Sequence, residues 1–89
     1  MKKAVDSEFK EICQSIINMN KKEDEWKLIE SSDMYQTVNY CGGYDATEGA
    51  FCFSYYDKGE EFWFQLTLNE IKEIAENTKD IFEIHPADL

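Results

Sequence analysis

The sequence predicts a single α+β domain over residues 1–89, with two helices on one face of an antiparallel sheet of three or four strands. Two observations predict this class. Apolar and polar side chains alternate over residues 50–68 on either side of Lys58-Gly59, as in the two strands of a hairpin. Apolar residues before and after this hairpin recur at helical spacing, which indicates an amphipathic helix on each side of it. The expected element order is α-β-β-β-α.

The first expected element is a helix over about residues 5–20. Its apolar side chains recur three and four positions apart, which places them on one stripe of the helix. They are Val5, Phe9, Ile12, Cys13, Ile16, Ile17 and Met19. Asp6 or Ser7 is positioned to cap the N-terminus, since a short polar side chain there accepts a hydrogen bond from a free backbone N–H. We expect the apolar stripe to cover the hairpin.

The segment between this helix and the hairpin is less regular. Residues 26–30 are either a fourth strand or an irregular segment pinned by Trp26, and Ser31-Ser32-Asp33 is typical of a turn. The next eight residues alternate, which predicts a strand over 34–41 followed by a glycine-rich loop over 42–49. One side of that strand would carry Met34, Val38 and Tyr40, and the other Tyr35, Thr37 and Asn39.

The turn of the hairpin decides which side chains share a face. A two-residue loop at Lys58-Gly59, or a four-residue loop over residues 57–60, places Tyr55 opposite Phe62, Phe53 opposite Phe64 and Phe51 opposite Leu66. A three-residue loop would instead place Phe53 opposite Trp63. We favour the first register because it gives one wholly apolar face. The second face then has no helix to cover it, and it would carry Cys52, Ser54, Tyr56, Glu61, Trp63, Gln65 and Thr67, joined by Tyr35, Thr37 and Asn39.

A second helix is expected directly after the hairpin. Thr67 and Glu70 match a capping box, in which each side chain accepts a hydrogen bond from a backbone N–H near the helix start. Apolar positions continue at helical spacing through Ile71, Ile74 and Ala75, with Phe82 as a possible extension. The helix must end before Pro86, and His85 is expected to be a surface residue.

Charge is the unusual feature of the composition. The chain has 19 acidic residues against 9 basic ones, a formal net charge of -10, and no arginine. Such a field repels nucleic acids and anionic membranes and attracts a basic partner. The many Lys, Ile and Asn residues and the missing arginine are typical of a protein from a low-GC bacterium or its phage. No N-terminal apolar targeting segment and no run of about 20 apolar residues is present, so we expect a cytoplasmic protein.

Catalytic and metal-binding motifs are missing from the sequence. Three cysteines without CxxC spacing and a single histidine do not make a zinc ligand set. A cysteine nucleophile would need a base, and His85 next to Pro86 is a poor candidate. Cys41 and Cys52 could face each other across neighbouring strands. We therefore expect no cofactor and no enzymatic activity.

Two functions fit these observations. The first is a small acidic inhibitor that occludes a basic protein, such as a nuclease or another nucleic-acid-binding effector, with carboxylates in place of phosphates. In size, acidity and helix-strands-helix order the chain resembles phage anti-CRISPR and other anti-defence proteins, and bacterial toxin-immunity proteins, although no motif assigns it to one of these families. The alternative is a non-catalytic structural or regulatory subunit that forms a homodimer or larger homo-oligomer through its sheet.

The candidate partner-binding residues lie in three stretches. The loop over 42–49 would present an aromatic anchor, Tyr44, with a charged rim of Asp45 and Glu48. The uncovered face of the hairpin would present two further aromatic anchors and supporting charge. The second helix would add carboxylates from its outer side. The residues of the hairpin and second helix are Tyr56, Glu60, Glu61, Trp63, Glu73 and Glu76.

Overall fold

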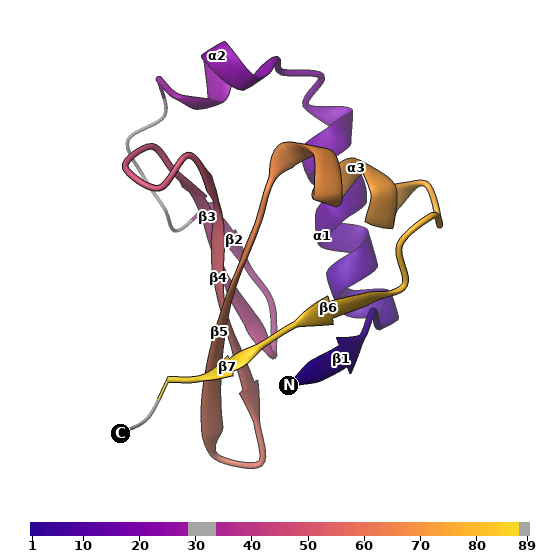
Figure 1. The fold of residues 1–89 in the computed structure, drawn as a ribbon, viewed down its shortest axis with the longest axis vertical. Helices are drawn as coiled ribbons and strands as arrows, with labels where there is room; N and C mark the ends of the chain where they lie inside the picture. The colour runs from indigo at the N-terminus through magenta and orange to yellow at the C-terminus, as the bar shows by residue number, and fades with distance from the viewer. Residues whose placement is uncertain (29–33, 88–89) are drawn as a thin grey trace.

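The computed structural model describes residues 1–28 and 34–87 and contains two layers, a five-stranded antiparallel sheet and a helical layer on one side of it (Figure 1). The strand order is β2-β3-β4-β5-β7. These strands are β2 (Tyr35–Gln36), β3 (Tyr40–Asp45), β4 (Ala50–Asp57), β5 (Glu60–Leu66) and β7 (His85–Pro86). A separate antiparallel pair joins β1 (Lys2–Ala4) to β6 (Ile81–Glu83). The helices are α1 (Ser7–Asn18), α2 (Glu23–Trp26) and α3 (Leu68–Ala75).

The predicted sheet of three or four strands with two helices in the order α-β-β-β-α is therefore wrong. The described residues form three helices and seven strands, although the α+β character is retained. Four of the strands, β1, β2, β6 and β7, are only two or three residues long. So short a run cannot show a period of two. Strands β1, β6 and β7 form because segments distant in sequence pair with each other, whereas β2 pairs with the neighbouring strand β3 across a tight turn.

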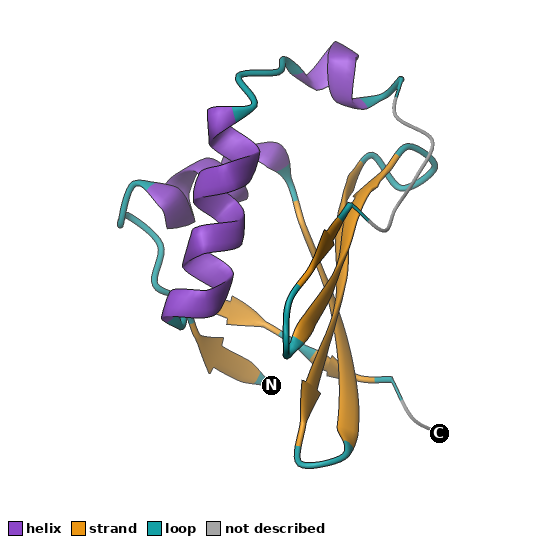
Figure 2. Ribbon diagram, turned by 180° about the vertical axis from the view of Figure 1, so that it is seen from behind, coloured by secondary structure: helices purple, strands orange, loops and turns teal. Residues whose placement is uncertain are grey.

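The central hairpin has the predicted register. Phe53 lies opposite Phe64, and Phe51 lies opposite Leu66. The turn residues Lys58 and Gly59 both adopt left-handed backbone angles, with φ of 53° and 81°, as expected for a two-residue turn that matches the twist of its strands. The phenylalanines and Leu66 face the helical layer and are buried. Figure 2 shows α1 and α3 on this side of the sheet.

Helix α1 supplies the centre of the core through Phe9. The Asp6 carboxylate caps the helix by accepting the Phe9 N–H at 2.8 Å, which selects Asp6 over Ser7 as the cap. The Phe9 ring is fully buried and stacks on Tyr40 with a centroid separation of 5.1 Å. It also meets Phe64 edge to face at 5.2 Å and lies 5.2 Å from Phe82. Burial of such a ring stabilises the fold by roughly 2–3 kcal/mol.

Polar contacts fasten the start of α1 to the sheet. Asp6 accepts hydrogen bonds from the Tyr40 hydroxyl at 2.8 Å and from the Lys3 ammonium at 3.1 Å. Glu8 accepts the backbone N–H and the side-chain amide of Asn39, both at 2.9 Å. Burial and then the bond to Asp6 raise the pKa of the Tyr40 hydroxyl, so it remains a donor at neutral pH.

The predicted strand over 34–41 is interrupted. A tight turn separates β2 from β3, with the Thr37 N–H donating to the Tyr40 carbonyl at 2.8 Å. Val38 at the turn is 90% exposed. The predicted sides are consequently wrong: Tyr35 pairs with Gly42, so it shares the face of the sheet that packs on the helices, and Asn39 is bound to α1.

The predicted loop over 42–49 is also shorter than expected. Residues 42–45 belong to β3, and the connection to β4 consists of residues 46–49. Gly42 is required here because a Cβ atom would collide with the Cys52 carbonyl oxygen and the Phe53 backbone on β4. Tyr44 lies against Trp26 and Phe51, with centroid separations of 6.1 and 5.2 Å.

Trp26 ends helix α2 and is fully buried. Its ring meets Phe51 edge to face at 5.0 Å, so it closes the end of the core next to Tyr44. In the predicted segment 26–30, Trp26 is the last residue of helix α2, and residues 27 and 28 form a turn rather than a strand. Residues 29–30 of that segment and the predicted turn over 31–33 lie outside the described residues.

Helix α3 begins at the predicted capping box. The Thr67 N–H donates to Glu70 at 2.9 Å, and the Glu70 N–H donates to the Thr67 hydroxyl at 3.1 Å. The helix ends at Ala75, and Asn77 turns the chain with a φ of 65°. Phe82 therefore lies in β6 rather than in an extension of the helix, but it still packs in the core. No helix in the described ranges is long and apolar enough to cross a membrane.

Candidate functional site

The side of the five-stranded sheet that faces away from the helices is the candidate site, and we call it the outer face. Every second side chain of the paired strands belongs to it, because successive side chains of a strand point to opposite sides. Figure 2 shows that no described element packs over this side. Its side chains are those of Gln36, Cys41, Asp45, Cys52, Ser54, Tyr56, Glu61, Trp63, Gln65 and His85.

Trp63 lies at the middle of the outer face. It is opposite Ser54 on β4 and opposite His85 on β7. The imidazole of His85 packs on the indole with a centroid separation of 4.5 Å and an interplanar angle of 32°. The indole nevertheless remains 43% exposed, whereas its neighbour Phe64 is fully buried on the other side of the sheet. The packing on His85 fixes one flank of Trp63, and solvent reaches the rest.

Tyr56 and Glu61 form one end of the outer face. They are directly opposite each other on β4 and β5, and Tyr56 is 43% exposed. Glu61 accepts a hydrogen bond from the Ser54 hydroxyl at 3.3 Å. Tyr56 is diagonal to Trp63 across β4 and β5, and both side chains border the same hollow. This end therefore combines two aromatic surfaces with a carboxylate, and Glu60 adds a second carboxylate at the hairpin turn.

Asp45 and Glu48 form the other end. The Asp45 carboxylate accepts the backbone N–H groups of Thr47 and Glu48 at 2.9 and 3.2 Å. Glu48 accepts the side-chain amide of Gln65 at 3.3 Å, which holds its carboxylate over the end of β5. Burial and then the charges of Asp45 and Glu48 raise the pKa of the Cys52 thiol. The two carboxylates thus impose a negative field on this end of the face.

A shallow hollow of about 350 Å³ lies between the two ends. Tyr56 and Trp63 border it on one side, and Asp45, Cys52 and Gln65 on the other. The outer face contains no lysine or arginine. The residues that line this hollow include one carboxylate, that of Asp45, and the aromatic side chains of Tyr56 and Trp63, but no cationic side chain.

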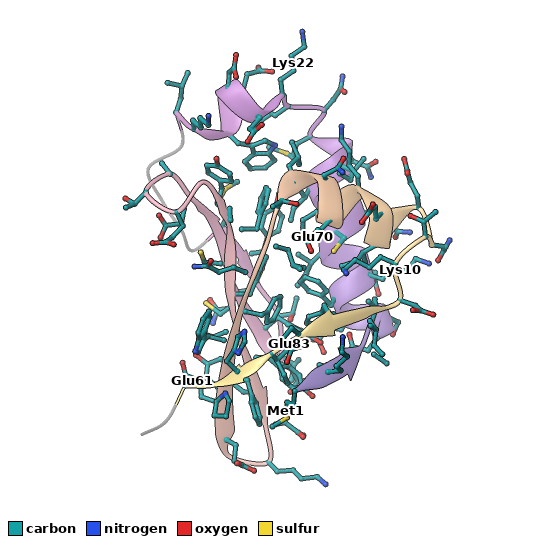
Figure 3. The ribbon with its side chains drawn as sticks, viewed as in Figure 1. Met1, Lys10, Lys22, Glu61, Glu70 and Glu83 are labelled. Carbon is teal, nitrogen blue, oxygen red and sulfur yellow. The ribbon has the colours of Figure 1, made fainter. Side chains whose placement is uncertain are left out.

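The structure does not bring all the predicted binding residues together. Asp45, Glu48, Tyr56, Glu61 and Trp63 share the outer face, and Glu60 lies at the adjacent turn. Glu73 lies on α3 and Glu76 is the C-cap residue of α3, and this helix is on the opposite side of the sheet. Figure 3 shows the same separation between Glu61 and the helical residues Glu70 and Lys10.

Tyr44 is a correction to the predicted site. Its side chain is 1% exposed and packs beneath Trp26, so it cannot anchor a partner at the surface. The glycines on either side of residues 44–48 suggested a loop, but residue 44 continues the alternation of β3 and falls on the apolar side of the sheet. Thr67, Tyr35, Thr37 and Asn39 also leave the outer face, since Thr67 caps α3 and the other three lie in or next to the β2–β3 turn.

His85 is the member of the site that sequence reasoning missed. The sequence predicts a surface residue at this position, and the structure shows a half-buried side chain that lies opposite Trp63. The pairing joins residues separated by helix α3 and strand β6. Nothing local to residue 85 indicates this contact, because a strand of two residues carries no periodic signal.

The thiols show no sign of nucleophilic activation. Burial raises the pKa of Cys13 to about 12 and also raises that of Cys52, so both are protonated at neutral pH. Cys41 on β3 and Cys52 on β4 are diagonal neighbours on the outer face, and both are free cysteines. Within the described ranges, no three His, Cys, Asp or Glu side chains are grouped so that they could hold a metal ion.

Comparison with known proteins found no matching family model, no matching curated protein and no matching solved structure.

Proposed function

We propose that the protein is a small, non-catalytic, acidic inhibitor that acts in the cytoplasm by binding a basic protein through the outer face. The partner is a nuclease or another nucleic-acid-handling effector, so the protein is of the anti-defence or toxin-immunity type. The observation that carries the proposal is an exposed Trp63 and Tyr56 on an uncovered sheet face with carboxylates at both ends.

The aromatic residues would supply most of the affinity. Trp and Tyr are enriched among the residues that dominate binding energy, especially at the centre of an interface where they lose contact with water. Trp63 is central on the outer face and is already held by His85, so little side-chain entropy is lost when a partner covers it.

The carboxylates would supply attraction and selectivity. A net charge of -10 on 89 residues accelerates the encounter with a cationic surface and repels anionic ones. A channel that binds a phosphate backbone is lined with Lys and Arg. Glu48 and Glu61, together with Asp45 and Glu60, would occupy such a surface and exclude nucleic acid sterically and electrostatically.

The alternative, self-association through the sheet, has one observation in its favour. The exposed indole of Trp63 could be covered by a second copy. A two-fold pairing of this face with the strands of the two copies aligned, however, places a carboxylate end of one copy against a carboxylate end of the other, because both ends are acidic. Like charges facing each other at an interface are unfavourable, so we place this function second.

The test is capture of partners from the native host with wild-type protein and two matched pairs of variants, followed by mass spectrometry. Trp63→Ala should reduce capture by about 30-fold or more, and Glu61→Gln should also reduce it. Val38→Ala, a change at another exposed apolar residue, and Glu76→Gln, a change on the opposite side of the molecule, should have no effect.

The captured protein should be basic, should elute with salt and should lose its nucleic-acid binding in the presence of the wild-type protein. Capture that is equal for all four variants would contradict the proposed role of the outer face. A stable dimer in sedimentation velocity that Trp63→Ala dissociates would favour the alternative function.

A further inference from the structure

We infer that the outer face recognises an extended basic segment with two cationic side chains four residues apart, the first held by Tyr56, Trp63 and Glu61 and the second by Glu48. This inference rests on the proposed function and specifies the part of the partner that is bound. It follows from the spacing of the groups along β5.

The first cation site is the corner between Tyr56, Trp63 and Glu61. Both rings are 43% exposed, they are diagonal neighbours, and Glu61 is directly opposite Tyr56. A cation above an aromatic ring is attracted to the ring face, and the attraction is strongest for Trp. An arginine suits this corner better than a lysine, since its planar guanidinium can stack on a ring while it donates to a carboxylate.

The second cation site is the carboxylate of Glu48. Gln65 holds it at 3.3 Å over the end of β5, and Gln65 is opposite Cys52 on β4. Asp45 is nearby but its carboxylate already accepts two backbone N–H groups. Glu48 therefore has more free acceptor capacity, and Asp45 reinforces the field.

The distance between these sites sets the spacing of the cations. Glu61 and Gln65 are four residues apart on one face of β5, which corresponds to roughly 13 Å in a strand. An extended partner segment has the same rise, so its residues i and i+4 project to the same side at the same separation. Its residue i+2 would lie over the hollow beside Trp63, where a small or apolar side chain fits.

A helical segment matches this spacing less well. Residues on one face of a helix recur at i+3, i+4, i+7, i+8 and i+11. The i+8 residue is rotated by roughly 80° about the axis, and the two that align best with residue i, i+7 and i+11, lie roughly 10 or 16 Å from it at 1.5 Å per residue. Neither value equals the separation of Glu61 and Gln65. An extended segment also packs on the flat outer face as one layer, as strands do in stacked sheets.

The test uses two synthetic peptides of identical composition, rich in Ser and Thr, that differ in the position of their two arginines. One has arginines at i and i+4, and the other at i and i+3. The second peptide projects its arginines to opposite sides when extended. Titration calorimetry at low salt should show binding of the first peptide that is at least about fivefold tighter, which corresponds to the loss of one exposed ion pair.

Variants of the protein separate the two cation sites. Tyr56→Leu, which keeps an apolar side chain but removes the ring face, and Glu48→Gln should each weaken the i, i+4 peptide about threefold to tenfold. Glu76→Gln, at the C-cap of α3, changes the net charge by the same amount as Glu48→Gln and should leave the affinity unchanged. Circular dichroism of each variant controls for folding.

Equal affinity for both peptides, or equal affinity of wild-type and Glu48→Gln protein for the first peptide, would overturn the inference. If capture of the host protein still required Trp63 in that case, the proposed function would stand and only the geometry of the bound segment would be wrong. Tighter binding of a peptide with arginines at i and i+7 would indicate a helical partner instead.

Discussion

The two tryptophans of this chain illustrate how position decides what a residue contributes. Trp26 is fully buried against Tyr44 and Phe51, whereas Trp63 is 43% exposed and contacts His85. Removal of a buried aromatic side chain loses its transfer free energy and leaves a cavity. Removal of an exposed aromatic side chain loses little transfer free energy and leaves no buried cavity. The same residue type thus serves stability at one position and is available for recognition at the other.

Substitution of the two tryptophans should therefore have unequal effects on stability. We expect Trp26→Ala to lower the free energy of unfolding by about 3–5 kcal/mol and Trp63→Ala to lower it by about 1 kcal/mol or less. Urea denaturation followed by circular dichroism measures both. A loss for Trp63→Ala as large as that for Trp26→Ala would mean that the outer face is part of the structural core.

Asp6 is a residue at which pH and stability are coupled. Burial alone would raise the pKa of its carboxyl, but hydrogen bonds from the Phe9 N–H, the Tyr40 hydroxyl and the Lys3 ammonium outweigh burial and hold the pKa below its usual value. A lowered pKa in the folded state means that the carboxylate stabilises the fold fully above the unfolded-state pKa of about 4. This stabilisation is lost as the pH falls through the folded-state pKa.

Asp6→Asn isolates this effect because asparagine still caps a helix. We expect the variant to be less stable by about 1 kcal/mol between pH 5 and 7, since it cannot accept the Tyr40 and Lys3 bonds as a charged group. The difference from wild type should shrink below about pH 4. Urea denaturation at a series of pH values measures it, and a difference that stayed constant down to the most acidic point would contradict this role of Asp6.

The roles of single residues could be predicted from the sequence where they depend on neighbours a few positions away. The capping role of Asp6, the capping box of Thr67 and Glu70 and the exposure of Trp63 next to a buried Phe64 all follow from neighbours close in sequence. Tyr44 and His85 were misplaced because their environments depend on distant segments, namely α2 for Tyr44 and β5 for His85.

At the scale of elements, the hairpin of β4 and β5 organises the rest of the fold. Its register was predictable because a two-residue turn and a strict alternation point to the same pairing. The edge strands β2 and β7 and the pair of β1 and β6 were not predictable. Each is two or three residues long. The pairing of β1, β6 and β7 joins segments that are distant in sequence, and β2 pairs with β3 across a short turn that interrupts the expected strand.

The turn of this hairpin can be tested directly. Lys58 adopts a left-handed conformation that asparagine tolerates better, so Lys58→Asn should stabilise the protein by about 0.5–1 kcal/mol. Gly59→Ala should destabilise it by about 1–2 kcal/mol, although no atom lies near the added Cβ, because the φ of 81° is unfavourable for alanine. Thermal and urea denaturation measure both changes. Equal stability of Gly59→Ala and wild type would show that the turn can adopt another conformation without cost.

At the scale of the whole molecule, the dominant property is the net charge of -10. Like charges on a compact chain repel each other and destabilise the folded state, whereas the same charges attract a cationic partner. Salt screens both effects, since the Debye length falls from about 30 Å at 0.01 M to about 3 Å at 1 M.

Added salt should therefore act in opposite directions on folding and on binding. We expect sodium chloride between about 0.01 and 1 M to raise the melting temperature of the isolated protein and to weaken its complex with the basic partner. Calorimetric melting and binding titrations over one salt series measure the two effects. Binding that is insensitive to salt would remove the electrostatic part of the proposed mechanism.

The unequal surroundings of the two tryptophans also have a practical consequence. An indole sealed in an apolar interior emits at shorter wavelength and is shielded from aqueous quenchers, whereas one in contact with water emits further to the red and is quenched readily. Trp26 and Trp63 meet these two conditions in the same chain. The unmodified protein thus contains two intrinsic optical probes: a blue shift of the Trp63 emission would report a partner arriving, and a red shift of the Trp26 emission would report the fold opening.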